Sequence, residues 1–285
     1  MKTGPQYFPL LLVAIVWLHP ANAGEPSPTD FSDKPPIVPP DNNGAGLSPD
    51  FVPPARSVFA GPQFEANALV LWDSGGFVTH PGAGVDGSDI SMASEDVNNA
   101  GDNVRKLEDN DFFRGADRFV LDQTYQLVHI STFGYEPLAA PPTWVSGNMK
   151  IWKGFPEQEG SILVFERYYS ELDLAFSGVY RILHLGDLDD VRRPVYEIGW
   201  WLRDPDDGTA PVLDDGEYWI DWQVVGGQSG WSIYVMEANL SEPDQPVTLV
   251  GDSHQLRPVG WTPMGVSSAF RVYGYGDEIF RDRFE

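Results

Sequence analysis

The chain has 285 residues and a formal net charge of −24, from 42 acidic and 18 basic residues. Phosphates of nucleic acids and anionic membrane surfaces repel so negative a chain, which excludes both as expected partners. Because the sequence contains no cysteine, it can form no disulfide and supplies no thiolate, so a core alone must stabilise its domain.

The N-terminal segment predicts export. Lys2 precedes a short apolar run from Phe8 to Leu18, and Ala21-Asn22-Ala23 follows. A basic start, a short apolar run and an A-x-A site are typical of a secretory signal peptide, with cleavage before Gly24. The run has 11 residues, whereas a helix that spans a bilayer needs about 20. We therefore expect residues 1–23 to be removed and the mature chain to be secreted, either periplasmic or extracellular, without a membrane span.

Three regions follow the predicted cleavage site. Residues 24–60 contain nine prolines and few large apolar side chains, a composition typical of a disordered linker. Residues 61–275 form the body, whose length suits one all-β domain. Residues 276–285 form an acidic and aromatic tail.

Within the body, apolar residues recur with a period of two, which is typical of strands. Asp215-Gly216 is a tight-turn signal, and only Glu95 to Leu107 could hold a helix, which Gly101 disfavours. Many short strands without a βαβ rhythm predict an all-β fold, a β-sandwich or jelly roll. The segments read as strands are 127–130, 149–152, 162–165, 179–183, 196–202, 218–225, 233–236 and 270–273.

Four motifs in the body are similar to those of a known type of domain. They are Gly115 to Val120, Met149 to Pro156, Ser177 to Arg181 and Gly216 to Trp222. On these motifs, residues 70–275 resemble a domain of uncharacterised function that recurs in secreted bacterial proteins. Ile279 to Glu285 is similar to the I-F-x-D-G-F-E tail of exported gammaproteobacterial proteins, with Arg283 where that tail has Gly. The resemblance implies export and a β fold, and it implies no reaction.

The sequence supports neither a serine-protease site nor a zinc site. Asp73-Ser74-Gly75-Gly76 resembles the D-S-G-G of trypsin-like proteases, but the only preceding histidine is His19, in the predicted signal peptide, so a turn explains the glycines better. No two of the later histidines have the spacing of a zinc site. These histidines are His80, His129, His184 and His254.

Two acidic loops are candidates for Ca²⁺, which takes six to eight oxygen ligands. They are Asp187-Leu188-Asp189-Asp190 and Asp204-Pro205-Asp206-Asp207-Gly208. Neither matches an EF-hand. Asp204, Asp206 and Asp207 either begin a calcium site or form a solvated turn.

The strongest binding candidate comes from strand alternation. If Tyr218, Ile220, Trp222 and Val224 face the core, then Glu217, Trp219, Asp221 and Gln223 face away from it. The same alternation directs Tyr196, Ile198, Trp200 and Leu202 inward and Glu197 and Trp201 outward.

If these two strands pair, their outer faces share one surface. Indole rings beside carboxylates are suited to sugar binding, since the ring packs on a pyranose and the polar groups bind its hydroxyls. The predicted site therefore consists of Trp201, Trp219, Glu197, Glu217 and Asp221. Two of the carboxylates could instead act in glycoside hydrolysis, or a loop could cover the tryptophans.

These observations favour a secreted, non-catalytic binding or surface protein, with carbohydrate as the ligand class considered. The alternatives are an extracellular hydrolase that acts on glycans and a purely structural or adhesive surface protein.

Overall fold

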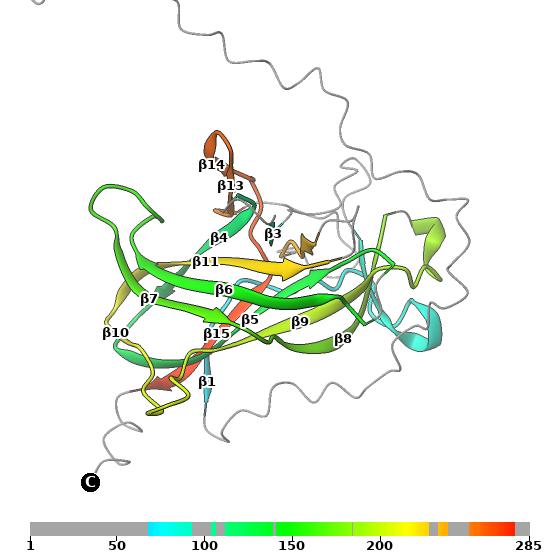
Figure 1. Cartoon of the computed structure of the whole chain (residues 1–285). Coiled ribbons are helices and arrows are strands. Elements are labelled where there is room, and N and C mark those ends of the chain that lie inside the picture. Colours follow the sequence, from blue (N-terminus) through cyan, green and yellow to red (C-terminus); the bar gives the residue numbers. More distant parts are fainter. Residues whose placement is uncertain are drawn as a thin grey trace, which may run out of the picture. The chain divides into compact units, whose positions relative to one another are not determined.

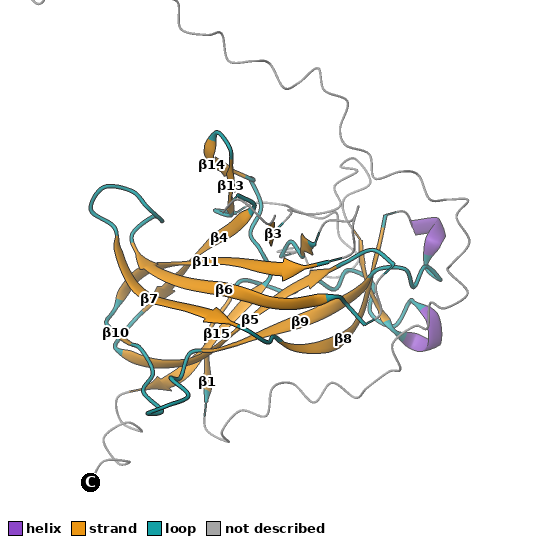
Figure 2. Cartoon of the chain, viewed as in Figure 1, coloured by secondary structure: helices purple, strands orange, loops and turns teal. Residues whose placement is uncertain are grey.

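The computed structural model describes residues 68–92, 104–106, 112–138, 141–183, 185–227, 233–238 and 251–276. The predicted signal peptide and linker lie outside these residues, as do His184 and all of the predicted tail except Gly276. The described part is all-β, with two sheets packed face to face and short 3-10 turns at Val85–Gly87 and Leu185–Asp187 (Figures 1 and 2). The predicted sandwich class is confirmed. Among the described residues, no helix is long and apolar enough to cross a bilayer.

The first sheet, sheet A, is mainly antiparallel. Its strands run in the order β1-β15-β5-β9-β8-β2, and the short strands β10 and β12 also pair with β5. Only β2 and β8 pair in parallel. The bounds are β1 (Leu69–Asp73), β15 (Phe270–Gly276), β5 (Tyr125–Tyr135), β9 (Pro194–Trp201), β8 (Asp173–Ile182), β2 (Asp89–Met92), β10 (Val212–Leu213) and β12 (Tyr234–Val235).

The second sheet, sheet B, has the order β14-β13-β4-β11-β6-β7, and β3 pairs in parallel with β11. β6 and β7 form a hairpin along one edge, and β13 and β14 form another along the opposite edge. The bounds are β14 (Gly260–Pro263), β13 (His254–Arg257), β4 (Arg114–Leu121), β11 (Gly216–Gly226), β6 (Trp144–Lys153), β7 (Ile162–Tyr169) and β3 (Arg105–Lys106).

The core lies between the sheets and is formed by alternate residues of both. Trp200 of β9 and Trp222 of β11 are fully buried, and their ring centroids are 6.0 Å apart. The residues predicted to face inward on both strands belong to this core, so the predicted alternation is confirmed. The outer face of each sheet is the face that points away from the other sheet.

The sequence predicted the long strands better than the short ones. Every predicted strand segment overlaps an observed strand, but the expected segments did not include β1, β2, β3, β4, β10, β13 and β14. Of the possible helix at Glu95 to Leu107, the structure describes only 104–106, where Arg105–Lys106 is a strand. The turn at Gly216, with a φ of 139°, does not close a hairpin, because β10 lies in sheet A and β11 in sheet B.

Asp117 is an acidic residue whose side chain is buried on the core side of β4. Asp117 lies on the same face of β4 as the core residue Phe119, and its carboxylate accepts hydrogen bonds from the backbone N–H groups of Arg118 (2.7 Å) and Ser268 (2.5 Å). Burial raises the pKa of Asp117 to about 7, against the lowering effect of these two hydrogen bonds.

The raised pKa predicts a pH dependence of stability. A carboxyl that holds its proton more tightly when folded stabilises the protein below its unfolded pKa of about 4, and this contribution disappears as pH rises through about 7. We expect Asp117→Asn, which cannot titrate, to remove this component. Urea unfolding of both proteins between pH 4 and pH 8 measures it: the difference in unfolding free energy should change with pH, and parallel profiles would contradict the prediction.

Candidate functional site

The two strands whose outer faces would share a surface if they paired lie in different sheets. β9 belongs to sheet A and β11 to sheet B, so Glu197 and Trp201 are separated by the core from Glu217, Trp219 and Asp221. The assumed pairing was wrong, because alternation along a strand does not determine which strand lies beside it. The five predicted residues therefore form two separate groups.

The group on sheet A is a polar cluster in which Glu197 and His129 are buried and Trp201 is partly exposed. Glu197 is 3% exposed and accepts a hydrogen bond from the Ser131 hydroxyl, while His129 Nε2 lies 3.1 Å from Ser131 Oγ. The His129 ring packs edge-on against Trp201 at 4.7 Å, and the Trp201 indole donates to Asp173 (3.1 Å). Burial raises the pKa of Glu197 and lowers that of His129 to about 3, so the histidine is neutral at ordinary pH. The polar and aromatic side chains of this cluster therefore bind and pack against one another, which is a structural role.

Trp219, on the outer face of sheet B, is covered by neighbouring rings. Phe155 from the β6–β7 turn lies 4.9 Å from its ring, and His254 of β13 lies 5.6 Å away. The indole is only 6% exposed, which matches the alternative that a loop covers it. Beside it, Glu217 is half exposed and pairs with Arg118 at 2.9 Å.

Asp221 is buried at the centre of sheet B and is held by several donors. Both of its carboxylate oxygens accept from the Arg114 guanidinium, and the Trp152 indole donates to Oδ2 at 3.1 Å. Arg114 also pairs with Glu157 at 2.7 Å and lies over the Trp261 ring at 5.4 Å. Burial raises the pKa of Asp221, and the Arg114 charge opposes this shift.

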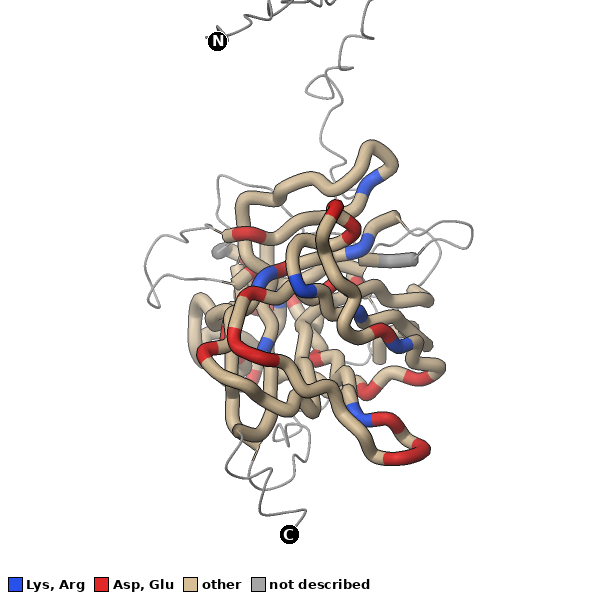
Figure 3. The backbone as a smooth tube through the Cα atoms, turned by 90° about the vertical axis from the view of Figure 1, so that its left-hand side faces the viewer, with Lys and Arg blue, Asp and Glu red and all other residues tan. Residues whose placement is uncertain are grey.

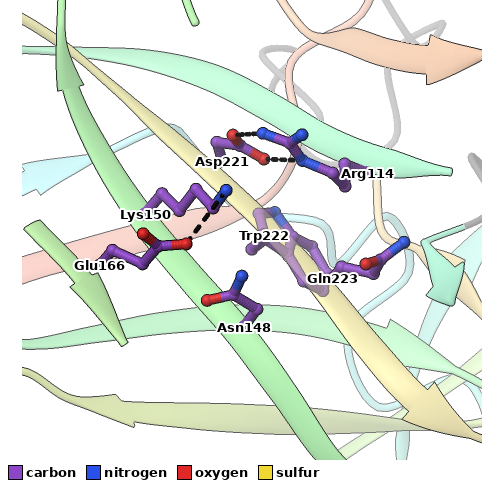
Figure 4. Close-up of a pocket in the computed structure, with 7 residues that line it drawn as sticks. All are labelled: Arg114, Asn148, Lys150, Glu166, Asp221, Trp222 and Gln223. Carbon is purple, nitrogen blue, oxygen red and sulfur yellow. Dashed lines mark hydrogen bonds and ion pairs between the residues drawn. The ribbon is translucent and has the colours of Figure 1, made fainter. Parts of the chain in front are cut away.

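A polar pocket of about 210 Å³ opens beside this pair on the outer face of sheet B (Figure 4). Four strands contribute to it, with Asp221 opposite Lys150, Gln223 opposite Asn148, and Lys150 opposite Glu166 in the strand registers. Alternation directs all of these side chains to the face opposite the core. The lining residues are Arg114, Asn148, Lys150, Glu166, Asp221, Trp222 and Gln223.

Most polar groups in this pocket already have a partner. The Lys150 ammonium pairs with Glu166 at 3.1 Å, and the Gln223 amide donates to the Phe112 carbonyl at 2.7 Å. The exceptions are Asn148 Oδ1 and Trp222 Nε1, which are buried and have no hydrogen-bond partner among the described residues. A buried polar atom without a partner carries an energetic cost that a bound hydrogen-bonding partner would remove.

The candidate calcium loops use their own carboxylates to form turns. Asp204 Oδ1 accepts from the backbone N–H of Asp206 (2.8 Å), and Asp207 Oδ1 accepts from both the backbone and the hydroxyl of Thr209. Asp190 accepts from Arg192 and Arg193 instead. Within the described ranges, no group of three or more His, Asp or Glu residues is placed to hold a metal ion.

The D-S-G-G motif has a structural role. Ser74 Oγ donates to the backbone carbonyl of Ser268 (2.7 Å) and accepts from the Phe270 N–H (2.8 Å), while Asp73 pairs with Arg271. The serine thereby ties the end of β1 to β15, which favours the interpretation as a turn.

Sequence reasoning identified Asp221 and the outward direction of Gln223 but did not identify Arg114, Asn148, Lys150 or Glu166. Alternation around the apolar residues Met149 and Ile151 would have placed Asn148 and Lys150 together on the opposite face. The alternation pattern could not give the order of the strands β4, β11, β6 and β7 in the sheet.

Comparison with known proteins identifies no matching family model, no matching curated protein and no matching solved structure.

Proposed function

We propose that this chain is an exported, non-catalytic binding protein whose pocket on the outer face of sheet B takes a sugar unit. The observation that supports this most directly is the pocket itself, where side-chain amides and charged groups from four strands converge and Asn148 Oδ1 has no partner in the described part of the chain. A polyhydroxylated ligand both donates and accepts hydrogen bonds, so it complements such a lining.

The charges around the pocket favour a neutral sugar over an anionic one. Arg114 and Lys150 supply two positive charges, but Asp221, Glu157 and Glu166 pair with them and outnumber them. The chain as a whole carries −24, and its acidic and basic positions are interspersed along the backbone in Figure 3. An anionic ligand would have to displace an existing carboxylate partner, whereas a neutral hydroxyl would not.

Binding is a better match than hydrolysis for these carboxylates. A glycosidase needs two carboxyl groups about 5 to 9.5 Å apart across the scissile bond, with one of them free to act as acid or nucleophile. Glu197 and Glu217 lie on different sheets, and both oxygens of Asp221 are occupied by Arg114. We therefore favour binding without cleavage.

The test is isothermal titration of the purified chain with neutral gluco- and manno-oligosaccharides of one to six units, alongside a thermal-shift assay. A ligand at 100 times its dissociation constant stabilises the folded state by about 2.7 kcal/mol, which is readily measured. Asn148→Ala should weaken binding, because it removes the unpartnered acceptor from the pocket.

Glu171→Ala provides a matched control, because this residue is exposed in the turn between β7 and β8, outside the pocket. It should bind like the wild type. If no oligosaccharide binds the wild-type chain, the proposal fails and the structural or adhesive alternative gains support.

A further inference from the structure

Tyr168 of β7 is a well-exposed aromatic ring on the outer face of sheet B. Its exposed fraction is 63%, whereas Trp219 on the same face is 6% exposed. The Tyr168 hydroxyl hydrogen-bonds Ser146 Oγ of the neighbouring strand at 2.9 Å, and Ser146 is itself buried. One end of the ring is therefore anchored while the ring remains accessible.

The strand register places this ring at the border of the polar pocket. Tyr168 is directly opposite Asn148, which lines the pocket, and Glu166 precedes it by two residues on the same face of β7. Side chains directly opposite in an antiparallel pair have Cβ atoms about 4.5–5.5 Å apart. The ring and the pocket therefore form one continuous surface on β6 and β7.

The pocket opens toward this side. Arg114, Asp221 and Gln223 are almost fully buried at its β4 and β11 end, whereas Glu166 of β7 is exposed and Asn148 and Lys150 are partly exposed. A volume of about 210 Å³ is below the roughly 300–1,000 Å³ of pockets that enclose drug-sized ligands. A ligand longer than one sugar unit must therefore continue out of the pocket over β6 and β7.

We propose that Tyr168 is the aromatic platform of an extended site, which binds a neutral oligosaccharide with one unit in the pocket and an adjoining unit stacked on the Tyr168 ring. This inference rests on the proposed function and deepens it by assigning a minimum ligand length and a second subsite. The ring face takes the apolar face of a pyranose, and the hydrogen bond to Ser146 reduces the side-chain entropy lost on binding.

The experiment compares how affinity depends on chain length. Glucose, cellobiose, cellotetraose and the matching manno-oligosaccharides are titrated into the purified wild-type chain, Tyr168→Ala, Tyr168→Phe and Asn148→Ala, with circular dichroism to verify folding. In the wild type, affinity should rise by about tenfold between one unit and longer chains, the scale of one aromatic contact. Tyr168→Ala should abolish this gain, and Tyr168→Phe, which retains the ring, should keep most of it.

Asn148→Ala should weaken binding at every length, which separates the pocket from the platform. If Tyr168→Ala shows the same length dependence as the wild type, the platform is refuted while the pocket proposal stands. If the wild type binds none of these sugars, the proposed function itself is refuted, and the platform with it.

Discussion

Asp221→Asn should lower the free energy of unfolding by about 3 to 5 kcal/mol, the cost typical of breaking a buried ion pair from one side. Asp221 is 1% exposed and Arg114 6% exposed, so the guanidinium would remain buried with only Glu157, which is 44% exposed, as a charged partner. The asparagine has nearly the same shape, which restricts the change to charge and hydrogen bonding. Urea unfolding followed by tryptophan fluorescence measures the effect.

Two further variants test whether the lost stability comes from the isolated buried charge of Arg114. Glu217→Gln breaks the exposed pair between Arg118 of β4 and Glu217 of β11 and should cost less than about 1 kcal/mol, because water screens surface pairs. The double replacement Arg114→Met with Asp221→Leu should recover most of the lost stability, since it leaves no isolated buried charge. A loss below 1 kcal/mol for Asp221→Asn would show that the guanidinium is well solvated after all.

Trp200→Ala should also destabilise the fold by about 3 to 5 kcal/mol, the range for removing a buried aromatic side chain from a core. Trp200 is fully buried between the sheets, where its ring meets Trp222 at 6.0 Å and Tyr169 at 5.3 Å. Its indole N–H also donates to Thr132 Oγ1 at 2.9 Å, and this buried hydroxyl would lose its donor.

The site around Trp200 cannot easily close after this change, because Trp222, Tyr169 and Gly147 of sheet B pack against the ring. Gly147 of β6 lies against the ring, so closely that a Cβ at this position would come within 2.7 Å of it. Val259→Ala is the matched control, because Val259 is 76% exposed in the β13–β14 turn, and it should change stability by less than about 0.5 kcal/mol. Equal effects in the two variants would contradict the packing described here.

The direction of side chains along each long strand was predictable from local pattern. On β11, the residues Tyr218, Ile220, Trp222 and Val224 alternate with Glu217, Trp219, Asp221 and Gln223, and the first four lie in the core. The prediction succeeded because successive side chains of a strand point to opposite faces. A few residues of alternating polarity are therefore enough to identify the buried face. The short strands β13 and β14 have no such pattern, since their residues are mostly half-buried.

The candidate site was predictable only in part. Asp221 was singled out correctly as an outward-facing acid, but its partner Arg114 is 107 residues away along the chain. Trp219 was assigned to the candidate site with cover by a loop as the alternative, and the turn that carries Phe155 covers it. Tyr168, the exposed aromatic residue of that face, lies on an edge strand whose neighbours could not be inferred from spacing.

By itself, then, the sequence determined the all-β class and which side of each long strand faces the core, because both depend on interactions between residues close together in the chain. Only the tertiary structure decided that β9 and β11 belong to different sheets, that Arg114 reaches Asp221, and that the pocket lies among β4, β11, β6 and β7. The reason is physical: strand order depends on which long-range pairings bury the most apolar surface together, and a local pattern of alternation is compatible with many such pairings.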